Sequence, residues 1–224
     1  MAQAGIHGLM GFAMSKLHFK KEWLLVGVII GNILPDLDAV VVAYYTLMGR
    51  DTIGLHRTWS HSVPFIAGLV LIIYIISIIS KNPRIGNFGI GLGVGMLGHV
   101  LLDMVTWFRG VQLFWPFYQE INFWQSFMPP EWWHNKFEFA LEFGMMALYL
   151  FFLSRFALKH RTDIEYLSII KTFIWLELFL FITFLILVYT WSGFYFVFGG
   201  VYIFSLLLIL YVTIRMRKTI ETIC

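Results

Sequence analysis

Long apolar runs dominate the pattern of hydrophobic and polar positions along this chain. A membrane-spanning helix needs about 20 predominantly apolar residues, and six stretches meet or approach that length. They are residues 23–45, 63–80, 85–108, 137–158, 168–190 and 194–214. Residues 2–15 are also apolar but form a shorter stretch, which suits a signal-peptide core, an interfacial helix or a short membrane segment. We expect an all-α fold, a polytopic transmembrane helix bundle with six clear spans plus a short N-terminal membrane helix.

The composition agrees with a membrane protein. Hydrophobic residues make up 59% of the 224 residues and charged residues 13%, against about 45–50% and about 25% in soluble domains. These values exclude a soluble globular protein and a disordered chain, and the unbroken runs do not fit a membrane β-barrel. No linker divides residues 1–224, so we expect a single membrane-embedded domain. Its expected partner is the lipid bilayer, and a net charge of +3 does not indicate nucleic-acid binding.

Basic residues are distributed unequally between the two sets of span ends. Of the 16 Lys and Arg residues, twelve flank one set, and the other set carries Arg50, Arg57, Arg109 and Lys136. Cytoplasmic loops are enriched in Lys and Arg. We therefore predict a multi-pass protein of the cell (inner) membrane with a cytoplasmic C-terminus and with loops 46–62 and 109–136 facing outward.

Three polar clusters interrupt the apolar pattern at positions where ionisable groups are costly and usually functional. They are residues 31–38 with Asp36 and Asp38, residues 56–62 with His56 and His61, and residues 98–103 with His99 and Asp103. The predicted topology brings all three to the outer side, where the first span should end near Asp38. Pro35 should disrupt the helix, so that irregular backbone turns Asp36 and Asp38 inward. His99 and Asp103 are four residues apart and share a helix face.

These clusters, with His7 from the N-terminal stretch, provide a candidate metal site. The candidate ligands are His7, Asp36, Asp38, His56, His61, His99 and Asp103. A single zinc ion uses three or four such ligands, so a two-metal site would employ more of them. We expect a divalent metal cofactor, one or two ions, with zinc favoured by the histidines and manganese or magnesium as alternatives. Residues 1–118 would carry this site, and residues 137–214 would add further transmembrane helices.

Three of the polar residues are candidates for catalytic roles. Asp36 or Asp103, if not fully engaged as a ligand, would accept a proton from water. Arg57, between two candidate ligands, would clamp a phosphate, or it would simply extend to the membrane interface. Ser62 precedes an apolar run with Pro64 at its start, which predicts a helix N-cap.

The same residues, taken in order, resemble a known family. The matching segments are His7, Pro35-Asp36-Leu37-Asp38, His56-Arg57-Thr58-Trp59-Ser60-His61-Ser62, Gly98-His99-Val100-Leu101-Leu102-Asp103 and Trp115-Pro116. This order is similar to the LexA-regulated inner-membrane family of proposed metal-dependent hydrolases, whose pattern has threonine where this chain has Ser60. The resemblance covers residues 1–118 and implies metal-dependent hydrolysis without naming a substrate. A more distant similarity to zinc-dependent phospholipases C implies phosphoester chemistry.

Two classes of function fit these observations. The first is a membrane-embedded metal-dependent hydrolase that acts on a phosphoester, such as a lipid head group at the outer face. The alternative is a transporter or structural membrane protein that uses the His and Asp residues for ion or proton passage. The one-sided placement of the candidate ligands favours the hydrolase, whereas Glu177 near the middle of a span favours the alternative. The sequence leaves the substrate, the metal and the oligomeric state open.

Overall fold

The computed structural model describes residues 4–17, 19–106, 108, 110–117, 120–125 and 127–223, with backbone alone at 134 and 135, so Arg109 lies outside the described residues. Its α-helices are α1 (Ala4–Met14), α2 (Leu24–Ile33), α3 (Asp38–Leu47), α4 (Val63–Ile79), α5 (Pro83–Thr106), α6 (Glu138–His160), α7 (Leu167–Thr190), α8 (Phe194–Arg215) and α9 (Arg217–Glu221). Within this described part the regular secondary structure is helical, apart from an isolated bridge between Val111 and Ile121, and loops join the helices.

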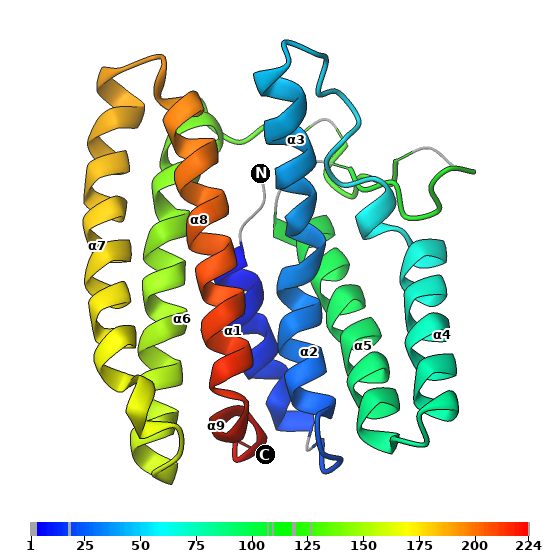
Figure 1. Cartoon of the computed structure of the whole chain (residues 1–224). Coiled ribbons are helices and arrows are strands. Elements are labelled where there is room, and N and C mark those ends of the chain that lie inside the picture. The colour runs from blue at the N-terminus through cyan, green and yellow to red at the C-terminus, as the bar shows by residue number, and fades with distance from the viewer. Residues whose placement is uncertain are drawn as a thin grey trace.

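The long helices form a bundle, as the sequence predicts (Figure 1). Five segments are long and apolar enough to cross a membrane: Leu24–Leu47, Pro83–Thr106, Glu138–His160, Ile164–Thr190 and Phe194–Arg215. Helix α4 is a sixth, shorter apolar helix. The predicted fold class, an all-helical polytopic bundle, is therefore confirmed.

The first long segment passes through Pro35 without ending. Helix α2 stops at Ile33, residues Leu34–Leu37 form one 3-10 turn, and α3 then continues to Leu47. Proline removes one backbone donor, and the tighter 3-10 turn accommodates that loss. The expectation that this helix ends near Asp38 is wrong, because the chain continues as α3 towards the end of the bundle (Figure 1).

Helix α1 enters the bundle only part of the way. Its 11 residues span about 16 Å, which is roughly half of a hydrocarbon core of about 30 Å. Its first residue, Ala4, is fully buried, and the helix packs against α2 and α6. The short N-terminal membrane helix is thus present, and its described residues do not make a complete crossing.

Helices α2 and α5 are in backbone contact. A Cβ atom added to Gly91 or Gly95 of α5 would collide with the carbonyl oxygens of Leu24 or Val28 on α2. Gly27 and Gly31 on α2 face the backbone of α5 in the same way. Glycines four residues apart allow membrane helices to approach this closely. The contact fixes the height of α2 relative to α5, and candidate ligands lie near its upper end, on α5 and in the 3-10 turn that follows α2.

The two ends of the bundle differ. The segments between α3 and α4 and between α5 and α6 lie at one end, which we call the loop end, and the shorter connections at residues 80–82 and 161–166 lie at the other (Figure 1). Most basic residues belong to these shorter connections with their adjoining helix termini, to the segment between α1 and α2, and to the C-terminal residues from Arg215 onward. The assignment of the loop end to the outer side of the membrane stays a prediction from the charge pattern.

Candidate metal centre

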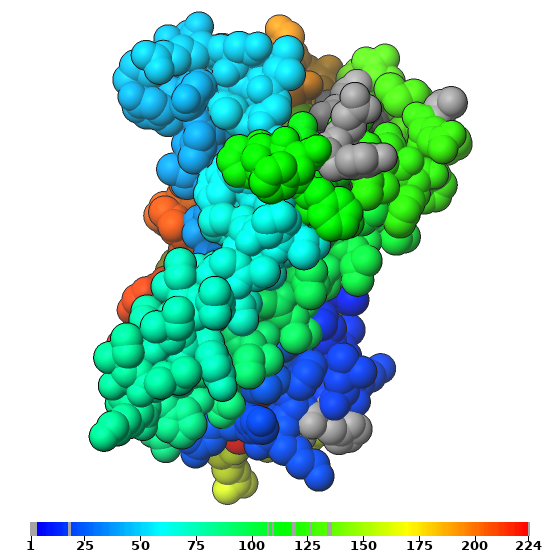
Figure 2. All heavy atoms as spheres, turned by 90° about the vertical axis from the view of Figure 1, so that its right-hand side faces the viewer, coloured from blue at the N-terminus to red at the C-terminus, as the bar shows by residue number. Residues whose placement is uncertain are grey.

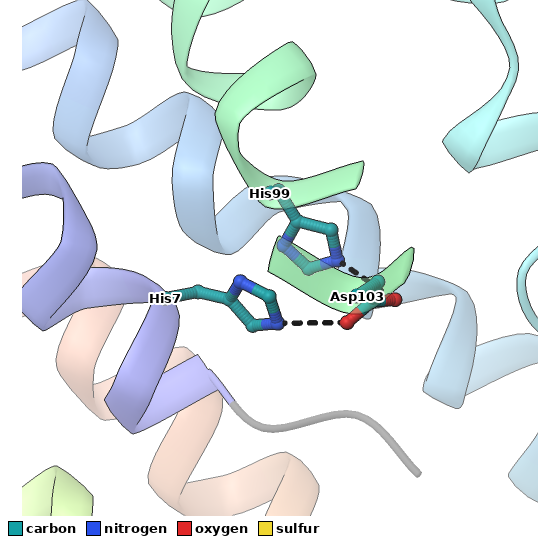
Figure 3. Close-up of side chains that lie close together, drawn as sticks. All are labelled: His7, His99 and Asp103. Carbon is teal, nitrogen blue, oxygen red and sulfur yellow. Dashed lines mark hydrogen bonds and ion pairs between the residues drawn. The ribbon is translucent and has the colours of Figure 1, made fainter. Parts of the chain in front are cut away.

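Helix α5 presents His99 and Asp103 to the interior of the bundle, one turn apart. Both side chains are buried, and the ring of His7 from α1 lies against them (Figure 3). The His7 and His99 rings are stacked with their centroids 3.6 Å apart. The Nε2 atom of His7 is 3.1 Å from Oδ1 of Asp103. Two segments about 90 residues apart in sequence therefore meet in one buried cluster.

Backbone and hydroxyl contacts orient two imidazoles of this cluster. Nδ1 of His99 lies 2.7 Å from the carbonyl oxygen of Asn32, so this nitrogen carries the proton and Nε2 bears the lone pair. Ser60 donates its hydroxyl hydrogen to Asp38 at 2.9 Å, and its oxygen lies 2.8 Å from Nδ1 of His61. That oxygen accepts the Nδ1 proton of His61, so its Nε2 also bears a lone pair.

The two lone pairs face each other. Nε2 of His61 and Nε2 of His99 are 3.0 Å apart, and neither nitrogen carries a proton in the tautomers described above. Two imidazoles on one zinc ion, with Zn–N bonds of about 2.0–2.1 Å, have nitrogens separated by about 3.3 Å in tetrahedral geometry. The arrangement is repulsive without a cation and favourable with one.

Carboxylates surround the same point. Oδ1 of Asp36 is 3.6 Å from Nε2 of His99, and Oδ2 of Asp103 lies 3.5 Å from Nε2 of His61 and 3.7 Å from that of His99. Two neutral imidazoles and two carboxylates form a donor set that suits zinc and other divalent ions. The residues present therefore fit a metal ion in the chemistry of their donor atoms.

The described residues contain three groups of candidate ligands, and within each group the ligand atoms lie no more than 4.8 Å from one another. The groups are His7, His99 and Asp103; Asp36, His61 and His99; and Asp38, His56 and His61. The three groups contain all seven residues that the sequence suggests as ligands, and we call them together the His–Asp cluster. Because His61 and His99 are shared between groups, the cluster is one continuous site.

Asp38 and His56 form the edge of the cluster nearest the loop end. Nδ1 of His56 is 2.8 Å from Oδ1 of Asp38. Oδ2 of Asp38 accepts hydrogen bonds from the Ser60 hydroxyl and from the backbone N–H of Arg57 at 3.3 Å. Burial lowers the pKa of His56 to about 4, although Asp38 opposes this shift. The ring is consequently neutral at pH 7, which is the state that ligates a metal.

Arg57 is held beside the carboxylates in an unusual backbone conformation. Its φ of 61° lies in the left-handed region, and its side chain is buried with Nε 3.2 Å from Oδ2 of Asp103. Its carbonyl oxygen accepts the N–H of Gln112 at 3.0 Å. The guanidinium group thus lies at the boundary between the His–Asp cluster and the loop end.

The comparison with protein families covers nearly the whole chain. A family model described as YdjM inner membrane protein matches residues 1–219. The chain belongs to the YdjM inner membrane protein family. The family match covers α6 to α8 as well, so the expectation that the likeness stops at residue 118 was too narrow. No curated protein and no solved structure gives a further match.

Some contributors to the cluster were not foreseen from the sequence. Asn32 acts through its backbone carbonyl, and Ser60 acts through a hydroxyl that bridges Asp38 and His61. Glu142 of α6 is different, because its place in an apolar span suggests a hydrogen bond inside the bundle or support of a metal ligand, and it accepts a hydrogen bond at 3.2 Å from the N–H of Gly5, two residues before His7. Backbone roles leave no side-chain signature, but the hydroxyl between two candidate ligands is a signal that could have identified Ser60.

Proposed function

We propose that this protein is a membrane-embedded metal-dependent hydrolase. The observation that carries the proposal is the pair of Nε2 atoms of His61 and His99, which face each other at 3.0 Å with carboxylates of Asp36 and Asp103 beside them. A metal ion between these nitrogens turns a repulsive contact into two coordinate bonds. The full burial of both rings adds to the argument, because uncompensated polar groups are costly at membrane depth.

The roles within the cluster follow from their contacts. His61, His99, Asp36 and Asp103 would hold the first ion, and His7 would ligate it beside Asp103 or orient that carboxylate. Asp38 with His56 would hold a second ion or orient the first set through Ser60. Outer contacts of this kind fix the tautomer and direction of metal-bound histidines. Zinc fits the imidazoles best, and manganese or magnesium would make greater use of the carboxylates.

A phosphoester is the substrate class that this arrangement favours. A bound divalent cation supplies Lewis acidity towards a phosphoryl oxygen and activates water at neutral pH. Arg57 offers a buried guanidinium next to Asp103, where it would bind a second phosphoryl oxygen. Whichever of Asp103 and Asp36 is not fully engaged as a ligand would accept the proton of the attacking water, and its withdrawal would leave an open position on the ion. The position of the cluster inside a membrane bundle favours a lipid phosphoester, with its tails left in the bilayer.

Metal analysis of purified protein tests the proposal. Wild-type protein should contain metal at near-stoichiometric levels and release phosphate-containing product from phospholipid vesicles. His99→Ala removes one of the two facing nitrogens, and we expect metal affinity to fall at least about 10-fold and turnover to be lost. Elemental analysis after dialysis and a product assay measure the two effects.

Glu131→Gln is a suitable control for this experiment, because Glu131 is an exposed carboxylate near the loop end that is not part of the His–Asp cluster. It should behave as wild type in both measurements. Full retention of metal in both His99→Ala and His61→Ala would contradict the proposal.

Ion or proton passage is a second candidate, and one observation favours it. Glu142 and Glu177 are fully buried on α6 and α7 and are close enough to interact electrostatically. These acids extend the ionisable groups beyond the His–Asp cluster into the second half of the chain. Metal binding without hydrolysis, together with a proton flux in proteoliposomes that Glu177→Gln abolishes, would favour this function over the hydrolase.

A further inference from the structure

A cavity lies at the loop end, beside the His–Asp cluster. Its volume is about 460 Å³, which falls within the range of about 300–1,000 Å³ that small-molecule sites occupy. Its walls come from two loop segments, around residues 52–58 and 108–128. Figure 2 shows these segments, in cyan and green, next to each other at the upper end of the molecule.

The cavity shares His56 with the His–Asp cluster, and Arg57 joins the two as a neighbour of both. His56 and Arg57 line the cavity, while His56 contacts Asp38 and Arg57 contacts Asp103. The backbone bond from Gln112 to Arg57 fastens the second loop segment to the first at this boundary. A molecule in the cavity would therefore place a phosphate against Arg57 and the cluster while the rest of it remained among the loops.

The side chains that line the cavity restrict which chemical groups the bound molecule can carry besides its phosphate. Uncharged hydrogen-bonding side chains prevail: Thr52, Thr58, Gln112, Asn122 and Gln125. Glu120 is the carboxylate and Phe108 the aromatic ring among the described lining residues. A quaternary ammonium group is bound by several aromatic faces, and the described lining residues offer a single aromatic ring. A second anionic group would meet Glu120, whereas hydroxyl groups find both donors and acceptors in amides and hydroxyls.

We propose that this cavity binds the head group of a polyol phosphoester, with hydroxyls held by Gln112 and its neighbours and the phosphate at Arg57. The inference rests on the proposed function, because it places the scissile phosphate at the metal centre. In the hydrolysis one water oxygen bonds to phosphorus, one P–O ester bond breaks, and the proton of the water passes to the alcohol oxygen that leaves. The cavity then determines which head groups are accepted.

Head-group selectivity of the purified, metal-loaded protein tests the proposal. Vesicles containing phosphatidylglycerol, phosphatidylcholine or phosphatidylethanolamine are compared, together with the acyl-free diester of phosphate with two glycerols. We expect phosphatidylglycerol to be hydrolysed at least about 10-fold faster than phosphatidylcholine. A preference for the lipid over the soluble diester identifies a membrane substrate, and equal rates identify a water-soluble polyol phosphoester.

Gln112→Leu removes an amide at nearly constant size and should reduce the preference about 3- to 10-fold through KM, with metal content unchanged. Glu131→Gln, outside the cavity, should retain the preference of the wild type. Equal rates for all head groups, or no effect of Gln112→Leu on selectivity, would overturn the cavity inference and leave the hydrolase intact. A preference for phosphatidylethanolamine that Glu120→Gln abolishes would also overturn it, in favour of an ammonium head group.

A binding measurement separates this inference from the proposed function. Calorimetric titration of His99→Ala with short-chain phosphatidylglycerol and phosphatidylcholine measures how tightly each lipid binds to the cavity. The measurement does not require hydrolysis, because this variant is expected to have lost turnover. Selective binding that Gln112→Leu removes would support the cavity even if wild-type protein hydrolysed no substrate. Absence of selective binding alongside active hydrolysis by wild type would refute the cavity alone.

Discussion

The two halves of the bundle differ in how their helices are used. In the most apolar 18-residue window of each span, 67% of residues are buried for Leu24–Leu47 and 61% for α5, but 17% for α7. The first half contributes the residues of a buried polar centre, whereas α7 presents most of its surface to the outside of the bundle. Hydrophobicity alone therefore does not reveal which helices form the interior of a membrane protein.

The contacts inside each half differ as well. Helices α2 and α5 approach through glycines, with backbone against backbone, whereas the second half packs through large rings such as Phe143 against Phe184 at 4.9 Å. Glycine contacts fix the relative height of two helices closely, which the His–Asp cluster requires because its donor atoms must meet within a few tenths of an ångström. Aromatic packing tolerates small shifts, and it suits a half that carries no candidate ligand.

The largest effect should come from the glycine contact. Gly95→Leu would drive a side chain into the carbonyl of Val28, and backbone cannot move aside as a flexible side chain can. Overpacking of this kind lowers the free energy of unfolding by about 1–3 kcal/mol and occasionally more, and we expect a value at the upper end of this range for Gly95→Leu. The yield of monodisperse protein in detergent and its thermal unfolding temperature should both fall.

Gly199→Leu on α8 is the matched control, since nothing lies within 4 Å of a Cβ added at this glycine. It should leave yield and unfolding temperature unchanged, or raise them slightly through the higher helix propensity of leucine. If the two substitutions lowered yield and unfolding temperature equally, the close backbone contact between α2 and α5 would not be what makes the first half sensitive to substitution.

The sequence predicts the spans well because their signal is local. Each span is encoded by its own run of apolar residues, so the predicted residues 63–80 and 194–214 correspond closely to α4 and α8. The disruption expected at Pro35 is present, but the expected end of the helix near Asp38 is wrong, since a proline stops a helix only when the neighbouring turn cannot absorb the lost bond. A 3-10 turn does so here, and α3 continues for ten residues.

The candidate site was predictable in its members but not in its geometry. His and Asp side chains at membrane depth are conspicuous in any sequence, and the structure brings all seven together. The facing nitrogens of His61 and His99 depend on the height of α2 against α5 and on the Ser60 hydroxyl. Such distances arise from packing between segments far apart in the chain, and no local pattern encodes them.

A smaller effect is expected where the two halves meet. Glu142 on α6 accepts the N–H of Gly5 at the start of α1, which satisfies one of the N–H groups that a helix N-terminus leaves unpaired. Glu142→Leu should loosen α1 and with it His7. Loss of an outer contact to a metal ligand typically costs 10- to 100-fold in affinity, and we expect about 10-fold, measured by competition with a metal chelator.

Glu142→Gln keeps an oxygen that accepts the Gly5 hydrogen bond, so it should recover most of the affinity. Glu177→Leu serves as a comparison, because Glu177 is also a fully buried glutamate of the second half but makes no described hydrogen bond to α1. If both leucine variants lost metal equally, the contact with Gly5 would not be the cause, and burial of any acid in this half would matter instead.

The smallest effect concerns the cap at the start of α4. The hydroxyl of Ser62 accepts the N–H of Phe65 at 3.3 Å, as the sequence predicts for a helix N-cap. Removing such a cap costs about 0.5–2 kcal/mol, so Ser62→Ala should lower the unfolding temperature by a few degrees. Ser80→Ala at the other end of α4 removes an exposed hydroxyl and should change it little.

Metal affinity separates this cap from the cluster next to it. Ser62 directly follows His61, yet the orientation of the His61 ring comes from Ser60 and Asp38 rather than from the helix that Ser62 begins. Ser62→Ala should therefore keep metal affinity within about twofold of wild type while stability falls. If metal affinity fell together with stability, the first turn of α4 would also help to orient the His61 ring. The His–Asp cluster would then depend on α4, at the edge of the bundle, as closely as it does on α2 and α5.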